Sequence, residues 1–414
     1  MLTIGKGGME MGMGTGMDTE QAEVTAEKEK GFLTKLIAVS VGHFFNDFYM
    51  NLVPPILFIF VSAMGLSLSQ QAFIAFVITS SGSFAQPFIG YIVDKRGKPW
   101  LLTLSLVWIA AWMSISGIIT NYYLLVLVVG VGALASALYH PLGSAMAVKL
   151  AKNSRGRSLS VFMTIGGFAA SVAPVVTIPI VERFGLTALV FFVIPGLVTA
   201  LFMHAAQIHK VALLPERTEK GKQNEKLNRK SVLWLSFLVF ISSSRVLVRG
   251  FLITFGVQIM MLGKWDVKIA GAVLSGYLFA NSFGTIVGGI ANDAIGSKRA
   301  LILFNGLTVL CMLAIVMTTG YTMLAGFVLM GIALGGSNTA NIVMAHELLP
   351  RNINMATGLI MGMSGGLGGL LMLLFGKLSD LHGLMAGSMY LMIPILLTVL
   401  STLLLPEKKN VVSG

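Results

Sequence analysis

The chain has 414 residues, of which 55% are hydrophobic and only 11% are charged, and its formal net charge is +12. Soluble domains carry roughly 25% charged residues, so these values exclude a water-soluble fold. The basic residues lie in short segments between apolar runs rather than along one face, which argues against a nucleic-acid partner and indicates a membrane topology signal.

Residues 1–32 mix glycine, methionine and both signs of charge, and we expect a disordered cytoplasmic tail there. Apolar runs long enough to cross a hydrocarbon core of about 30 Å then follow one another along the chain. They predict spans at 33–60, 70–93, 99–118, 122–147, 159–181, 186–208, 232–262, 267–291, 299–318, 321–345, 354–376 and 384–405. The sequence therefore predicts an all-α membrane protein with twelve transmembrane helices.

These spans divide six and six. We expect an N-terminal six-helix bundle at 33–208, a cytoplasmic central loop at 209–231, a C-terminal six-helix bundle at 232–405 and a cytoplasmic tail at 406–414. Loop lysines and arginines concentrate on the side of the central loop, so the positive-inside rule places both termini in the cytoplasm. Cys311 is the single cysteine, which excludes a disulfide within the chain.

A short loop pattern occurs twice. It comprises Gly90, Asp94 and Gly97 after the second span and, 199 residues later, Gly289, Asp293 and Gly296 after the eighth. Basic residues follow in both loops. This repetition at one topological place predicts two pseudo-symmetric bundles. Asp94 and Asp293 can pair with loop cations and helix termini, so we expect a conformational gate rather than substrate binding.

Both loops resemble motif A of the major facilitator superfamily. Within that superfamily, the chain resembles the fosmidomycin resistance family of bacterial drug exporters. The matching segments are His43-Phe-Phe-Asn46-Asp47, Tyr139-His140-Pro141, Glu347-Leu-Leu-Pro350 and Met355-Ala-Thr-Gly358. The resemblance implies two bundles around a central substrate cavity, alternating access, a location in the bacterial inner membrane and a monomer. The resemblance further implies that the protein is not an enzyme and that it uses no cofactor.

Ionisable side chains inside spans are costly and usually face a cavity or a partner. Asp47 lies near the middle of the first span, His43 is on the same helical face, and His140 in the fourth span should lie at a similar depth. We expect Asp47 to exchange a proton and the histidines to tune or relay it. The alternative is a permanently ionised Asp47 that pairs with Arg245 or is capped by Asn46.

Arg245 and Arg249 are four residues apart in the seventh span. Two guanidinium groups suit a phosphonate, phosphate or carboxylate substrate. In the alternative, Arg245 pairs with Asp47 and Arg249 reaches a backbone carbonyl or the interface. We also expect Asn46 and Tyr139, which belong to the matching segments, to contact the substrate.

Glu347 lies at the cytoplasmic end of the tenth span, where we expect a gate ion pair with Arg351 or Lys298. We expect no metal site and no catalytic residue. The resulting hypothesis is a proton-coupled antiporter that exports a drug or small organic anion across the lipid bilayer. Because the fifth span carries fewer glycines than exporters of this type, an importer of a metabolite or metal chelate with the same fold is the alternative.

Overall fold

The computed structural model describes residues 15–96, 98–150, 155–211, 229–349, 356 and 358–407, and these residues form helices and connections without a β-strand. The first half contains α1 (Thr15–Met50), α2 (Leu57–Met64), α3 (Leu68–Arg96), α4 (Trp100–Ile115), α5 (Tyr122–Leu150), α6 (Arg155–Phe184) and α7 (Val193–Ala205). The second half contains α8 (Arg229–Leu262), α9 (Val267–Ile295), α10 (Ser297–Met317), α11 (Gly320–Leu348), α13 (Ser364–His382), α14 (Leu384–Tyr390) and α15 (Met392–Leu403).

Prolines and glycines set the breaks between these helices. Pro54 and Pro55 lack a backbone N–H, and they form a 3-10 turn that separates α1 from α2 within one span. Gly296 and Gly383 have φ values of 84° and 86°, which allow a single residue to separate α9 from α10 and α13 from α14. A π-helix at Gly358–Met363 leads into α13.

Eleven of the described helical segments are long and apolar enough to cross a membrane. The predicted span at 70–93 corresponds to α3, whose 29 residues are long enough to cross a membrane. Its polar side chains Gln71 and Ser80 are buried, because α3 packs against α5 and α13. The predicted twelve-helix membrane fold is therefore confirmed, with one span that lies mainly against protein.

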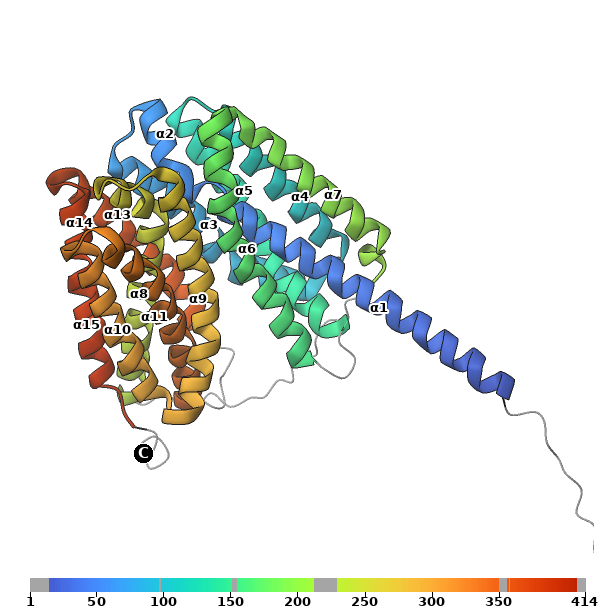
Figure 1. The fold of residues 1–414 in the computed structure, drawn as a ribbon. Helices are drawn as coiled ribbons and strands as arrows, with labels where there is room; N and C mark the ends of the chain where they lie inside the picture. Colours follow the sequence, from blue (N-terminus) through green and yellow to red (C-terminus); the bar gives the residue numbers. More distant parts are fainter. Residues whose placement is uncertain are drawn as a thin grey trace, which may run out of the picture.

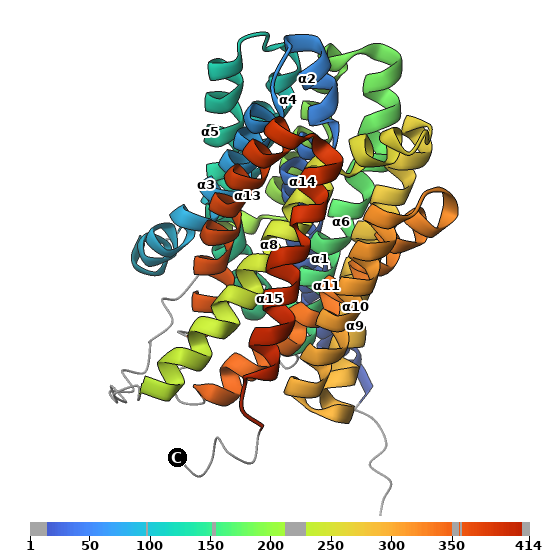
Figure 2. The ribbon, with the colours of Figure 1, turned by 90° about the vertical axis from the view of Figure 1, so that its left-hand side faces the viewer.

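The two halves form two lobes, α1–α7 and α8–α15, that lie side by side (Figure 1). Two helix pairs connect the lobes, α3 with α13 and α6 with α9. Figure 2 shows α3 next to α13 from the side of the second lobe. The lobes diverge toward the end of the molecule where the C-terminus lies (Figure 1).

Small residues allow the two connecting pairs to approach closely. On the first pair, Gly376 of α13 faces Ala72 of α3. On the second pair, Gly271 of α9 faces Ile178 of α6, and the rings of Phe168 and Phe279 are 6.1 Å apart between centroids. These contacts lie in the half of the molecule away from the C-terminus, where the described helices of the two lobes are closed against each other.

Hydrogen bonds between the lobes strengthen the closed end. The Asp380 carboxylate at the end of α13 accepts from the backbone N–H of Leu68 at 2.7 Å and of Ser69 at 2.9 Å. It thus caps the first turn of α3 from the opposite lobe. Nearby, the Gln71 side-chain amide donates to the Thr254 carbonyl and to the Gln258 side chain, both at 2.9 Å.

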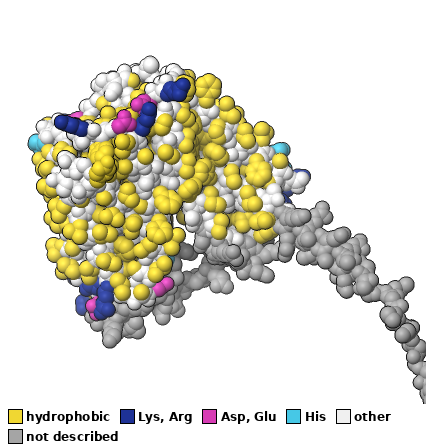
Figure 3. Space-filling view, in the orientation of Figure 1, with side chains coloured by type: hydrophobic (Ala, Val, Ile, Leu, Met, Phe, Trp, Pro, Cys, Tyr) yellow, Lys and Arg dark blue, Asp and Glu magenta, His cyan; other side chains and the backbone are white. Residues whose placement is uncertain are grey.

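Hydrophobic and charged side chains are distributed over the surface as in a protein that spans a bilayer. Hydrophobic side chains cover the flanks of the helices, and the charged side chains gather at the two ends (Figure 3). Inside the second lobe, Cys311 on α10 is buried, with 3% of its surface exposed.

The N-terminal segment differs from the expectation of a disordered tail over residues 1–32. Helix α1 begins at Thr15 and extends well beyond the bundle (Figure 1). Residues 18–30 contain glutamate, lysine, glutamine and alanine with no glycine or proline. These are strong helix formers, which explains why the first span continues backwards as one helix.

Candidate functional site

Three ionisable side chains meet inside the first lobe. His43 and Asp47 lie one turn apart on α1, and His140 comes from α5. The Asp47 carboxylate lies 3.5 Å from His43 Nε2 and 3.4 Å from His140 Nε2. His43 Nε2 and His140 Nδ1 are 3.2 Å apart. We call these three residues the His–Asp–His cluster.

A backbone carbonyl fixes the position of one proton in this cluster. His43 Nδ1 lies 2.7 Å from the Phe162 oxygen, which can only accept, so Nδ1 carries a proton. In neutral His43 the lone pair is then on Nε2, where it accepts from His140 Nδ1. Neutral His140 consequently directs its own Nε2 lone pair toward the Asp47 carboxylate.

Two acceptors facing each other are unfavourable, and one additional proton removes the conflict. If the additional proton is on His140, an imidazolium lies beside the Asp47 carboxylate. If the proton is on Asp47, a neutral carboxylic acid can donate to the His140 ring nitrogen. The arrangement can therefore hold and release one proton in the space between His140 and Asp47.

Neighbouring residues hold the cluster in place. The Asn46 amide donates to Asp47 at 2.9 Å and to the Ser136 hydroxyl at 3.1 Å. The Tyr139 hydroxyl donates to the Val39 carbonyl at 2.8 Å. The His43 ring stacks on Phe162 with centroids 4.0 Å apart. Both Asn46 and Tyr139, predicted to contact substrate, are fully buried in this state, where they pack around the cluster.

Access to the cluster is one-sided. His43 is only 1% exposed, whereas the side chains of His140 and Asp47 are 30% and 20% exposed. Gly166 on α6 covers the other side, and a Cβ added there would lie 2.6 Å from Asp47 Oδ2. The two residues between which the proton is shared are thus the ones that solvent reaches.

The same three side chains could also hold a metal ion, because one ligand atom from each lies within 4.8 Å of the others. However, the His43 lone pair that a metal would need already accepts a hydrogen bond from His140. The geometry as it stands therefore suits a shared proton better than a metal.

Arg245 does not pair with Asp47. The ion pairs that the described residues form with Asp47 come from the two histidines. The Arg245 guanidinium instead donates to the Ser242 hydroxyl at 3.3 Å and lines a small cavity within the second lobe. Arg249, one turn further along α8, interacts electrostatically with Arg245 and with Tyr277 of α9. Of the two alternatives for Asp47, the pairing with Arg245 is absent and the hydrogen bond from Asn46 is present.

The predicted gate residues are only partly described. Gly97 lies outside the described residues, as does the partner Arg351 proposed for Glu347, and Gly90 and Asp94 lie in the last turns of α3. In the second lobe, Asp293 is exposed near the end of α9, and Gly296 forms the turn into α10. Glu347 of α11 accepts a hydrogen bond from the Ser297 hydroxyl at 2.9 Å, which ties α11 to the start of α10.

Sequence reasoning did not identify Phe162, Gly166 and Asp380. Phe162 acts through its backbone oxygen, which no side-chain pattern reveals. Gly166 lies in the fifth span, where the glycine content was used only to weigh export against import. Asp380 is 312 residues from Leu68, so the cap on α3 became visible only when the lobes were placed together.

Two lobes of membrane-spanning helices, with a partly accessible ionisable cluster inside the first lobe, are typical of a polytopic membrane transporter rather than an enzyme. The chain belongs to the Major Facilitator Superfamily, because the family model matches residues 39–264 and 257–413.

Curated relatives are similar over most of the chain. The Fosmidomycin resistance protein of Escherichia coli (strain K12) is 26% identical over 83% of this chain and 86% of its own. The uncharacterised transporter YfnC of Bacillus subtilis (strain 168) is 27% identical over 84% of this chain and 87% of its own.

Solved structures share the fold at low sequence identity. The nucleoside transporter NupG matches with a TM-score of 0.70 and 13% identity over 93% of this chain and 99% of its own. A bacterial homologue of the human lysosomal transporter Spinster matches with a TM-score of 0.73 and 13% identity over 92% of this chain and 98% of its own.

Proposed function

We propose that the protein is a proton-coupled antiporter that exports a drug or another small organic anion from the cytoplasm by alternating access. The observation that carries this proposal is the His–Asp–His cluster, in which the Phe162 carbonyl leaves a place for one exchangeable proton between His140 and Asp47. The similarity to a protein named for fosmidomycin resistance supports export as the direction.

In the proposed cycle, the lobes are open toward the cytoplasm in the state described above. The cluster loses its proton on that side, and the substrate binds between the lobes. Rocking of the lobes breaks the Asp380 cap and opens the other end, where the substrate leaves and a proton enters from outside. Export follows if the lobes change state when they carry the proton or the substrate, and not when they carry neither.

An anionic substrate is supported by the charges on α8. Arg245 and Arg249 repel each other across one helical turn, and neither forms an ion pair with a carboxylate among the described residues. A bound anion would relieve this repulsion. We assign direct contact with the substrate to Arg249, and Arg245 adds positive charge from one turn away.

We further propose that the protein is a monomer in the bacterial inner membrane with both termini in the cytoplasm. The excess of basic residues in loops on the side of the central loop supports this orientation. In this orientation, the diverging end of the lobes faces the cytoplasm.

The test uses purified protein in liposomes that contain a pH-sensitive dye, with a proton gradient across the membrane. Phosphonates, antibiotics and organic anions are added in turn to wild type and to Asp47→Asn. Asp266→Asn is the matched control, because Asp266 only caps α9 within its own lobe. Substrate-dependent proton movement that is lost in Asp47→Asn and kept in the control supports the proposal. Equal responses from all three proteins would refute it.

The second candidate is a proton-coupled importer of a metabolite or metal chelate. The shared fold with a nucleoside transporter favours it. The same liposomes distinguish the two, because in an importer the substrate would accumulate on the side toward which protons flow.

A further inference from the structure

Arg245 is a cation without a carboxylate partner inside the second lobe. Its guanidinium makes one hydrogen bond, to the Ser242 hydroxyl, and its Nε atom is buried without a partner. Arg245 is partly buried, and a guanidinium without an ion pair in the middle of a membrane protein is costly, so the charge should have a counter-ion. No side chain among the described residues supplies one to Arg245 as an ion pair.

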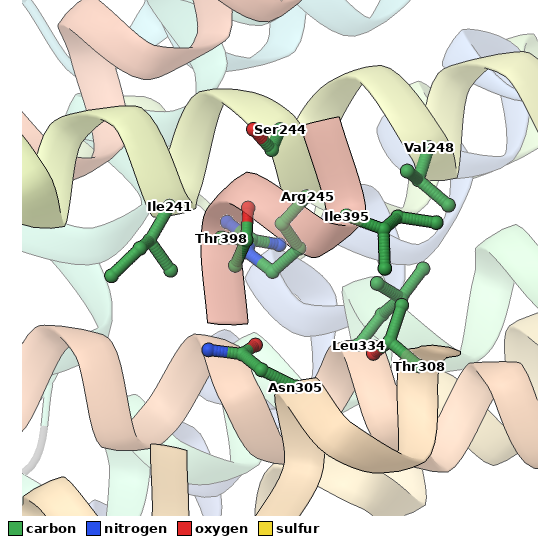
Figure 4. Close-up of a pocket in the computed structure, with 9 residues that line it drawn as sticks. All are labelled: Ile241, Ser244, Arg245, Val248, Asn305, Thr308, Leu334, Ile395 and Thr398. Atoms are coloured by element: carbon green, nitrogen blue, oxygen red, sulfur yellow. The ribbon is translucent and has the colours of Figure 1, made fainter. Parts of the chain in front are cut away.

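The cavity beside Arg245 is enclosed by four helices of one lobe. Its lining residues come from α8, α10, α11 and α15 and are Ile241, Ser244, Arg245, Val248, Asn305, Thr308, Leu334, Ile395 and Thr398. Figure 4 shows Arg245 and Thr398 on the lining of this cavity, with Asn305 and Thr308 on the facing helix. The cavity lies within the second lobe rather than between the lobes.

Two hydroxyl groups in this cavity also lack partners. Ser244 and Thr398 are 2% and 7% exposed, and neither hydroxyl makes a hydrogen bond within the described chain. By contrast, Asn305 is satisfied, because it donates to Thr402 and accepts from Ser337. Buried polar groups normally have a partner, so the unpaired Nε and the two hydroxyls indicate that something occupies the cavity.

The space is about 10 Å³, which is room for one water-sized particle and too little for an organic molecule. A guanidinium can only donate and each hydroxyl has one proton to donate, so the three groups together can surround an anion. We propose that Arg245, Ser244 and Thr398 hold a resident monatomic anion, chloride under physiological conditions. This site goes beyond the proposed function, because the ion would remain in the lobe as a counter-charge and would not be transported.

Thermal unfolding of the purified full-length protein tests the site in sodium chloride, sodium bromide and sodium gluconate at equal ionic strength. An anion at ten times its Kd shifts the folding equilibrium about elevenfold, which for a chain of 414 residues corresponds to a rise of roughly 1–2 °C in Tm. We expect this rise in chloride and bromide relative to gluconate, with saturation. It should disappear in Arg245→Gln and persist in the matched control Arg249→Gln.

Because Arg245→Gln is a core substitution, Thr398→Val provides a milder second variant that should weaken halide binding several-fold without removing the charge. Bromide should also give an anomalous scattering peak beside Arg245 in crystals. Equal Tm values in all three salts, a halide effect that survives in Arg245→Gln, or a water without bromide at this position would overturn the proposal. These measurements involve no transport, so they are independent of whether protons are exchanged.

Discussion

His43 donates its Nδ1 proton to the Phe162 backbone oxygen at 2.7 Å and stacks its ring on the Phe162 side chain. One residue of α6 thereby sets both the tautomer and the orientation of a histidine on α1. Because a backbone oxygen is not removed by substitution, this relationship depends on how α6 packs on α1.

His43→Phe should retain the ring stack and remove the hydrogen bonds to Phe162 and His140. We expect proton-coupled transport to fall by about 10²-fold, as for loss of a positioned proton-transfer group. The measurement is the initial rate of substrate-dependent proton movement in liposomes. His382→Phe, at the end of α13, is the control and should behave as wild type. Normal coupling in His43→Phe would show that Asp47 and His140 suffice.

Gly166→Ala should disturb the cluster from the α6 side. The added Cβ would lie 2.6 Å from Asp47 Oδ2 and in contact with His43, so either α6 or the cluster must shift. Overpacking of this kind costs about 1–3 kcal/mol. We expect reduced Tm and impaired coupling. Gly250→Ala is the matched control, since a Cβ at Gly250 meets no atom within 4 Å. Wild-type coupling in Gly166→Ala would contradict the observed packing.

Asp380→Ala should destabilise the closed end of the lobes. The carboxylate caps α3 from the other lobe, and loss of a helix cap costs about 1 kcal/mol, which is roughly a fivefold change in population. Spin labels at exposed Phe184 on α6 and Ile269 on α9 should report a larger fraction of the widely separated state.

The control for this experiment is Asp266→Ala, which removes a cap that lies entirely within α9. It should lower stability by a similar amount and leave the label distances unchanged. If both variants shift the distances equally, the Asp380 cap has no special role between the lobes.

Gly288→Ala should destabilise the second lobe, whereas Gly289→Ala should not. A Cβ on Gly288 of α9 would lie 2.6–2.7 Å from backbone atoms of Gly336 on α11, and backbone cannot move aside as a flexible side chain can. At Gly289 the nearest atom is the Thr339 methyl, at 3.9 Å. We expect a loss of about 1–3 kcal/mol for the first variant, measured by thermal unfolding. Equal Tm values for the two would contradict the close helix approach.

Exchange of one inward proton for one outward monovalent anion should depend on membrane potential. The proton moves one positive charge inward, and the anion that leaves is electrically equivalent to a second one. A potential of 100 mV, negative inside, would therefore add roughly 4.6 kcal/mol of driving force for the two charges. A potassium diffusion potential imposed on the liposomes should therefore accelerate export. Insensitivity to the potential would argue against this stoichiometry or against an anionic substrate.

Most of the fold could be predicted because each span is a local property of the sequence. Runs of apolar residues between basic loops give the helices without any knowledge of their partners. The hydropathy of α3 predicts its span but not its partners, because the buried Gln71 amide donates to groups on α8 of the other lobe. The helical start of α1 was not predicted, because the mixture of glycine, methionine and both signs of charge in residues 1–32 was interpreted as a disordered tail although residues 18–30 are good helix formers.

The site was predictable only where it depends on one helix. His43 and Asp47 are separated by one turn, so their proximity follows from helical geometry. The approach of His140 depended on an estimate of depth, and it is confirmed by the 3.4 Å distance to Asp47. Contacts made by backbone atoms, by glycines and between lobes depend on three-dimensional packing, and residue types alone do not indicate them.

The single cysteine of the chain, Cys311 on α10, is buried within the second lobe. Thiol reagents should therefore leave the native protein unmodified, and it offers a naturally silent background for site-directed labelling. Fluorophores, cross-linkers or spin labels attached to a newly introduced cysteine can then report on lobe movement in the otherwise unaltered transporter, without first constructing a cysteine-free version.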